Sequence, residues 1–200
     1  MSRNAQIAAL ALLLVALAPT AALAGGNANF TIGLRDLSGD WDPLDSQIML
    51  GATVDWGMDD WPVHLAWGLN ASADSQDNIY GYGPWNTSAA YAELSFGALW
   101  LPIRDKPVRP YLGAGIASVA VAYEEEAFGR TVDGDDQAFT YYANAGIYWR
   151  LGPRFNLGID LRYGGAPEFD VSVSSKFEDS IKKDGGYFAY SLLLGFGWGN

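Results

Sequence analysis

Apolar and polar residues alternate over long stretches of this chain. Along residues 155–163 (FNLGIDLRY) bulky apolar side chains occupy every second position, with small or polar ones between them. A period of two is typical of a β-strand with one apolar face and one polar face. The pattern predicts eight such strands, at Asn29–Leu37, Gln47–Gly57, Pro62–Ala71, Ala89–Leu101, Arg109–Ala122, Gln137–Leu151, Arg154–Tyr163 and Gly186–Trp198. Each is near or above the roughly 9–11 residues that a tilted strand needs to cross a bilayer.

The connections between these strands alternate in length. Residues 58–61, 102–108 and 152–153 form short turns, whereas 38–46, 72–88, 123–136 and 164–185 are longer and more polar. Short turns at one end and long loops at the other are typical of an outer-membrane barrel. We therefore expect an all-β fold, an eight-stranded antiparallel transmembrane up-and-down β-barrel with short periplasmic turns and long extracellular loops. A soluble barrel would instead place its apolar residues inside.

The N-terminus predicts export. Arg3, the apolar run from Ile7 to Ala18 and the small residues Ala22 and Ala24 have the layout of a cleaved signal peptide. Residues 1–24 are therefore expected to be the signal peptide and residues 25–200 the barrel domain, located in the cell outer membrane.

Composition excludes two further features. The chain has no cysteine, which excludes disulfides. Its net charge of −11 argues against nucleic-acid binding.

Aromatic residues are concentrated at the predicted strand ends. Five of the eight tryptophans lie next to the short turns or the C-terminal end: Trp56, Trp61, Trp100, Trp149 and Trp198. A second group is expected near the opposite rim: Tyr80, Tyr82, Trp85, Tyr123, Tyr163 and Tyr187. Because tryptophan and tyrosine favour the membrane–water interface, both groups are expected to form aromatic girdles.

The polar face of the strands carries charges that would lie inside the barrel. These are Arg35, Asp55, Glu93, Asp160 and Arg162. The interior of an eight-stranded barrel is only wide enough for side chains to fill it, and buried charges there require partners. The favoured interpretation is a salt-bridged plug, in which Glu93 and Asp160 each have a basic partner. The alternative is a narrow polar path lined by the same groups.

Two segments resemble a known family. Residues 109–116 (RPYLGAGI) resemble a strand common in OmpA-type eight-stranded outer membrane β-barrels, and residues 142–163 resemble that family's penultimate hairpin. The resemblance implies residence among outer membrane lipid and lipopolysaccharide, and insertion by the barrel assembly machinery. The partner of the loops is not specified by it.

Few residues suggest catalysis or ligand binding. Lipid-A-modifying barrel enzymes resemble this chain in size, but His64, the only histidine, is expected to face inward as a packed core residue. The acidic loop segments 124–126 and 133–136 could attract Ca²⁺ or Mg²⁺, yet they lack the spacing of a defined site. No catalytic residue, metal site or cofactor is predicted, and an enzyme is not expected.

The preferred function is a structural or surface-interaction role through the loops. The alternative is a narrow channel or lateral-path transporter.

Overall fold

The computed structural model describes residues 25–38, 41–58, 61–80, 83–103, 105–127, 130–165, 167–172 and 180–198. Residues 1–24, where the signal peptide is expected, lie outside this part of the chain. The strands are β1 (Gly25–Leu37), β2 (Ser46–Gly57), β3 (Val63–Tyr80), β4 (Gly83–Trp100), β5 (Val108–Ala127), β6 (Arg130–Arg150), β7 (Phe155–Gly164), β8 (Glu168–Ser172), β9 (Ser180–Asp184) and β10 (Tyr187–Trp198). In the described residues no helix is long and apolar enough to cross a membrane.

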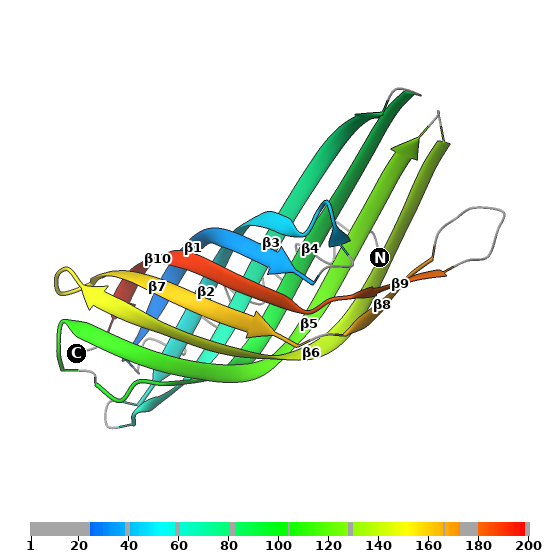
Figure 1. Ribbon diagram of the computed structural model, residues 1–200. Helices are drawn as coiled ribbons and strands as arrows, with labels where there is room; N and C mark the ends of the chain where they lie inside the picture. Colours follow the sequence, from blue (N-terminus) through cyan, green and yellow to red (C-terminus); the bar gives the residue numbers. More distant parts are fainter. Residues whose placement is uncertain are drawn as a thin grey trace, which may run out of the picture.

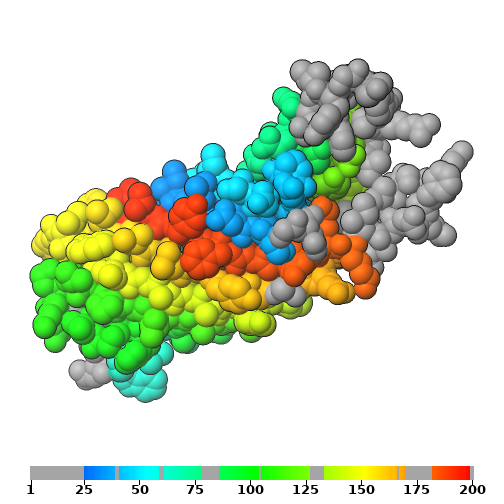
Figure 2. All heavy atoms as spheres, viewed as in Figure 1, coloured from blue at the N-terminus to red at the C-terminus, as the bar shows by residue number. Residues whose placement is uncertain are grey.

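Eight of these strands close into a barrel, as the alternation predicts (Figure 1). The order around the barrel is β1-β10-β7-β6-β5-β4-β3-β2, and all neighbours are antiparallel. The pairing of β1 with β10, from Gly26 opposite Trp198 to Leu37 opposite Tyr187, closes the sheet. The wall that β1, β10, β7 and β6 form is continuous on the face that Figure 2 shows.

The two faces of the wall differ as their alternation requires. Leu192 on β10 points outward and is 56% exposed, whereas its neighbour Ser191 points inward and is buried. Outward positions of the other barrel strands likewise carry large apolar side chains, among them Phe30, Ile48, Leu69 and Phe139. Exposure of so much apolar surface is stable only if something other than water covers it.

Four barrel strands are longer than expected. The sequence predicts loops at 72–88 and 123–136, but the described residues of both segments continue β3, β4, β5 and β6 as paired strands. Pairing of β2 with β3 ends at Ala73, and pairing of β7 with β6 ends at Tyr142, so these hairpins project beyond the rest of the barrel (Figure 1). We call their outer parts, residues 74–80, 83–89, 123–127 and 130–136, the distal sheet. Without an apolar face, these segments gave no strand signal.

Two other predicted loops also contain ordered structure. Segment 164–185 includes the two-stranded sheet β8–β9, which is separate from the barrel sheet. Segment 38–46 contains Trp41 and Leu44, which are only 1% exposed. Both segments lie at the same end of the barrel, since a hydrogen bond joins the Trp41 indole nitrogen to the Asp184 carbonyl oxygen at 2.7 Å. Trp41, Leu44 and Phe169 from these segments are buried at the barrel mouth.

The interior is filled by two apolar clusters. The distal cluster, toward the distal sheet, contains Leu37, Trp41, Leu44, Met49, Ala89, Tyr91, Ala117, Val119, Val121, Tyr142, Phe169, Tyr187 and Ala189. The proximal cluster, toward the short turns, contains Ala66, Leu99, Leu101, Tyr111, Tyr148 and Leu193. Along β4, Glu93 lies between Tyr91 of the first cluster and Leu99 of the second. A charged residue is thus placed between two apolar layers.

Candidate functional site

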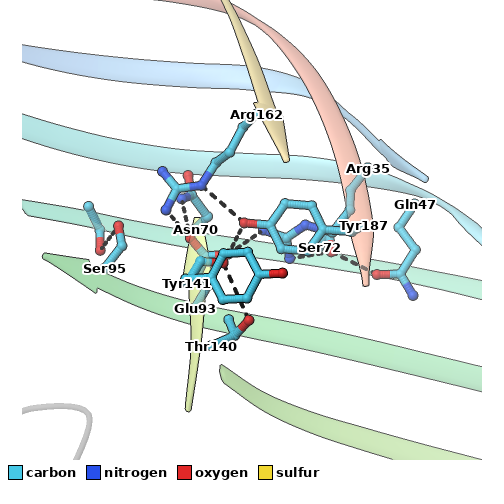
Figure 3. A network of polar contacts seen from close by, with 11 residues as sticks. Arg35, Gln47, Asn70, Ser72, Glu93, Ser95, Thr140, Tyr141, Arg162 and Tyr187 are labelled. Carbon is cyan, nitrogen blue, oxygen red and sulfur yellow. Dashed lines mark hydrogen bonds and ion pairs between the residues drawn. The ribbon is translucent and has the colours of Figure 1, made fainter. Parts of the chain in front are cut away.

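The centre of the lumen contains a charged cluster formed by Arg35, Glu93, Arg162 and Tyr187. Strands β1, β4, β7 and β10 each contribute one of these residues, and Figure 3 shows the two guanidinium groups approaching Glu93. The Arg162 Nη2 atom lies 2.5 Å from Glu93 Oε1, and the Arg35 Nη2 atom lies 3.5 Å from Glu93 Oε2. Both Arg35 and Glu93 are completely buried. These contacts tie opposite parts of the barrel wall together across the lumen.

Tyr187 completes the cluster, although its position near a predicted strand end suggests an aromatic girdle. Its hydroxyl group donates to Glu93 and accepts a hydrogen bond from Arg162 Nε at 3.0 Å. The side chain is only 3% exposed, so the assignment to the rim was wrong. The alternation held the correct signal, because Phe188 and Tyr190 point outward and Tyr187 must therefore point inward.

Neutral polar groups extend the charged cluster toward β2 and β3. Arg35 Nη1 donates to Ser72 Oγ at 3.1 Å, and that hydroxyl donates to Gln47 Oε1 at 2.7 Å. Asn70 Nδ2 lies 3.5 Å from Glu93 Oε1. Aromatic rings cover the remaining faces: Arg35 lies 4.2 Å from the centre of the Tyr91 ring. No sequence pattern identifies Gln47 or Ser72 as members of this group, since buried neutral residues can be recognised only once their neighbours are known.

Asp160 has neutral partners instead of the expected basic one. It accepts a hydrogen bond from the Tyr111 hydroxyl group and another from Asn144 Nδ2 at 2.8 Å. Among the described residues Asp160 forms no ion pair, so the expectation that it has a basic partner was wrong. The same expectation for Glu93 is confirmed, because Glu93 contacts two arginines. Asp160 and Arg162 nevertheless line the same small internal cavity, whose volume is about 30 Å³.

Removal of the Tyr111 hydroxyl group tests how strongly Asp160 depends on neutral donors. Tyr111→Phe is expected to lower the free energy of unfolding by about 1–3 kcal/mol, because a buried carboxylate loses one of its hydrogen bonds. Urea unfolding in lipid vesicles, followed by gel mobility, measures the change. Tyr141→Phe is the matched control, since Tyr141 is 62% exposed on the outer wall. Equal effects of the two variants would contradict this role of Tyr111.

Asp55 forms a second polar group near the short-turn end of the barrel. His64 Nδ1 lies 2.7 Å from Asp55 Oδ1, and Asn27 Nδ2 donates to the same oxygen at 3.0 Å. Asn156 Nδ2 then donates to Asn27 Oδ1 at 2.8 Å. His64 is 7% exposed and faces inward. The five charged residues identified in the sequence therefore divide into the charged cluster, the Asp160 group and this Asp55 group.

The five tryptophans lie at one end of the barrel. Trp56 and Trp198 are both opposite Gly26, and Trp100 is opposite Val63 at the start of β3. Trp61, in the short turn before β3, and Trp100, at the end of β4, are both exposed. Trp149 is opposite Val108 at the start of β5. At the opposite rim, Tyr163 is 49% exposed, whereas the side chains of Tyr80, Tyr82 and Trp85 lie outside the described residues. A membrane-interface role for the tryptophan ring remains our proposal.

The distal sheet forms a charged surface at the other end. Residues 74–89 and 123–136 contain eight acidic residues, Asp74, Asp77, Glu124, Glu125, Glu126, Asp133, Asp135 and Asp136, and one basic residue, Arg130. Glu124 and Asp133 are directly opposite each other on β5 and β6. Tyr123 donates to Glu125 at 2.8 Å, and its partial burial together with this bond raises the pKa of the Tyr123 hydroxyl group. Like charges directly opposite each other oppose pairing, so a ligand of opposite charge would relieve the repulsion.

The closed antiparallel sheet, the apolar outer wall and the polar lumen define a transmembrane β-barrel. Residues 7–199 match the outer membrane protein beta-barrel domain, and the chain belongs to that family. It is located in the outer membrane, where lipid covers the apolar wall described above. No curated protein matches the chain.

Solved outer-membrane barrels have the same fold. OprG from Pseudomonas aeruginosa is 12% identical with a TM-score of 0.65, and the match covers 88% of this chain and 97% of OprG. Ail of Yersinia pestis, solved in complex with the heparin analogue sucrose octasulfate, is 10% identical with a TM-score of 0.55, over 88% of this chain and 97% of Ail. Neisserial surface protein A is 12% identical with a TM-score of 0.54, over 86% and 94%. At these identities the likeness establishes the fold alone.

Proposed function

We propose that this protein is a non-enzymatic outer-membrane barrel with a closed lumen, which presents its distal sheet outside the cell as an interaction surface. The observation that carries the proposal is the combination of a filled interior with four strands that continue beyond the membrane-spanning wall. The lumen keeps a cavity of only about 30 Å³ in its polar region. Structure outside the bilayer, in contrast, is extensive and regular.

The filled lumen supports an interaction role over the alternative role as a channel. A water-filled path would require Glu93 to release Arg35 or Arg162, and each release leaves a charge buried without its partner. The distal and proximal clusters would also have to open, because apolar side chains fill both. A barrel of eight strands offers no space around such a plug.

The charge of the distal sheet favours a basic partner. Its segments combine eight acidic residues with one arginine. Ail binds a polyanionic heparin analogue in its complex, but a polyanion would be repelled by this surface. Potentials of opposite sign attract partners and accelerate their encounter. The expected partners are therefore basic protein surfaces, or anionic lipopolysaccharide bridged by divalent cations.

Conductance across a planar bilayer distinguishes the proposed role from transport. Protein refolded in detergent and inserted into the bilayer is expected to give no discrete current steps, because the charged cluster and both apolar clusters close the lumen. Heat-dependent gel mobility confirms that the inserted protein is folded. Reproducible steps that change in Glu93→Gln or Arg162→Ala would overturn the closed-lumen proposal and make a narrow channel the leading interpretation.

Co-sedimentation of protein-containing lipid vesicles tests the interaction surface. Vesicles of neutral lipid carrying the protein are expected to bind poly-L-lysine and not heparin. The quadruple variant Glu124→Gln, Glu126→Gln, Asp133→Asn and Asp135→Asn should lose most of this binding, and added salt should weaken it in the unmodified protein. A matched control replaces four acids elsewhere: Asp42→Asn, Asp105→Asn, Asp170→Asn and Glu168→Gln. Equal binding by both variants would contradict the role of the distal sheet.

A further inference from the structure

Phe169 fills the mouth of the barrel from outside the barrel sheet. It belongs to β8, which pairs only with β9 in a separate two-stranded sheet. Its side chain is nevertheless completely buried, with 0% exposure. Close packing continues at the base of this hairpin, where a Cβ atom on Gly185 would overlap the Phe169 ring. A peripheral hairpin therefore inserts one aromatic ring into the lumen.

The surroundings of Phe169 form a pocket of the size of a benzyl group. Phe169 meets the Tyr91 ring edge-on, with a distance of 6.5 Å between ring centres. The rest of the distal cluster, including Trp41, Val119 and Val121, completes the apolar wall. Edge-to-face contacts at this distance are favourable for any aromatic ring, whether it belongs to the chain or to a ligand. Phe169 thus occupies a place that a small aromatic molecule could take.

Beneath this pocket lies a surplus of hydrogen-bond donors. Arg35 lies 4.2 Å from the centre of the Tyr91 ring and 4.5 Å from that of Tyr187, and its Nε atom has no hydrogen-bond partner in the described part of the chain. The buried hydroxyl group of Tyr91 also lacks a partner there. Buried polar groups normally have partners, so two unpartnered groups in one place indicate a missing acceptor.

The charge of this region is opposite in sign to that of an anionic acceptor. Two arginines, Arg35 and Arg162, share the single carboxylate of Glu93. In the described part of the chain Asp160 forms no ion pair with either arginine, and its hydrogen bonds come from Tyr111 and Asn144. A carboxylate would bring both the acceptor oxygens and the negative charge.

We propose that this pocket is a binding site for a small aromatic carboxylate, and that Phe169 occupies it in the absence of ligand. The ring of the ligand would replace Phe169 against Tyr91, and its carboxylate would face Arg35 and the Tyr91 hydroxyl group. The hairpin can leave without disturbing the barrel ladder, since β8 and β9 form no ladder with it. At its base, Trp41 Nε1 and Ser38 Oγ both donate to the Asp184 carbonyl oxygen, and these contacts must break when the hairpin leaves. Binding needs no passage through the closed lumen.

Opening the pocket by mutation tests the site directly. Phe169→Ala, refolded in detergent and checked by heat-dependent gel mobility, is expected to bind 3-phenylpropionate with a Kd of about 1–10 mM. The unmodified protein should bind about 10- to 100-fold more weakly, because the Phe169 ring competes for the same space. Ligand-observed NMR titration measures both affinities. Phe169→Val, which also removes the ring, replaces the alanine variant if that variant does not fold.

Two comparisons make the result specific. Toluene has the same ring without the carboxylate, and it should bind Phe169→Ala at least about tenfold more weakly than 3-phenylpropionate, because charge-assisted hydrogen bonds distinguish the two. Phe139→Ala is the matched protein control, since Phe139 is 79% exposed on the outer wall, and it should bind like the unmodified protein. Absence of binding to the folded Phe169 variants would overturn the proposal. Equal affinity for toluene would overturn the assignment of a carboxylate.

Discussion

Replacement of Glu93 by alanine is expected to lower the free energy of unfolding by about 3–5 kcal/mol. The variant leaves Arg35 and Arg162 in the lumen without the carboxylate that both contact. It also removes the acceptor of the Tyr187 hydroxyl group. Breaking a buried ion pair by removing one partner is costly because the remaining charge cannot regain its hydration. Equilibrium urea unfolding in lipid vesicles, followed by heat-dependent gel mobility, measures the loss.

Glu124→Ala is the matched control for this variant. Glu124 is exposed on the distal sheet and lies directly opposite Asp133. Its removal should change the free energy of unfolding by no more than about 0.5 kcal/mol, as is usual for surface substitutions. Comparable losses in the two variants would mean that the charged cluster does not hold the barrel wall together.

An arginine on the lipid-facing wall is expected to have the second largest effect. Leu192 lies near the middle of β10, between Ile32 on β1 and Ile159 on β7, and points outward. Leu192→Arg should lower the free energy of unfolding in a bilayer by about 2–4 kcal/mol, because the charge must enter or deform the hydrocarbon region. Refolding titrations in phospholipid vesicles measure this change.

The distal sheet offers a control with the same change of charge. Ser75 lies on β3 beyond Ala73, the last residue that pairs with β2, and is exposed. Ser75→Arg is expected to leave stability within about 0.5 kcal/mol of the unmodified protein, since water surrounds this part of the strand. A cost equal to that of Leu192→Arg would place the distal sheet inside the membrane and contradict the proposed function.

The direction of the barrel side chains could be predicted from alternation alone. Leu192 and Ser191 differ in exposure as their positions require, and Arg35, Asp55 and Glu93 all face inward. The same rule, applied fully, would have placed Tyr187 in the lumen. The partners of inward residues could not be predicted, because the stagger of the strands decides which ones meet across the lumen. Glu93 therefore meets two arginines, whereas Asp160 meets a tyrosine and an asparagine.

The structure of segments outside the hydrocarbon region was the hardest to predict from the sequence. The distal sheet is regular β-structure, yet its sequence resembles a polar loop. Only scattered positions such as Ala89 pack against the interior, so no continuous apolar alternation marks these strands. The burial of Trp41 and Phe169 could not be predicted for a related reason. A single apolar residue in a polar segment has no period, and only contact with the distal cluster shows that it is buried.

The sequence by itself determined the class of fold, the location in the outer membrane and the two faces of the wall. In the hydrocarbon region every backbone polar group must be hydrogen-bonded and the side chains that face lipid must be apolar. Every second residue of a membrane-spanning strand is therefore apolar, and this pattern can be recognised in the sequence. Only the tertiary structure decided how the lumen is filled, how far β3–β6 extend and which ring occupies the mouth. These features depend on contacts between residues far apart in the chain, such as Arg162 with Glu93 or Phe169 with Tyr91. No local pattern encodes such contacts, because they arise from closure of the sheet.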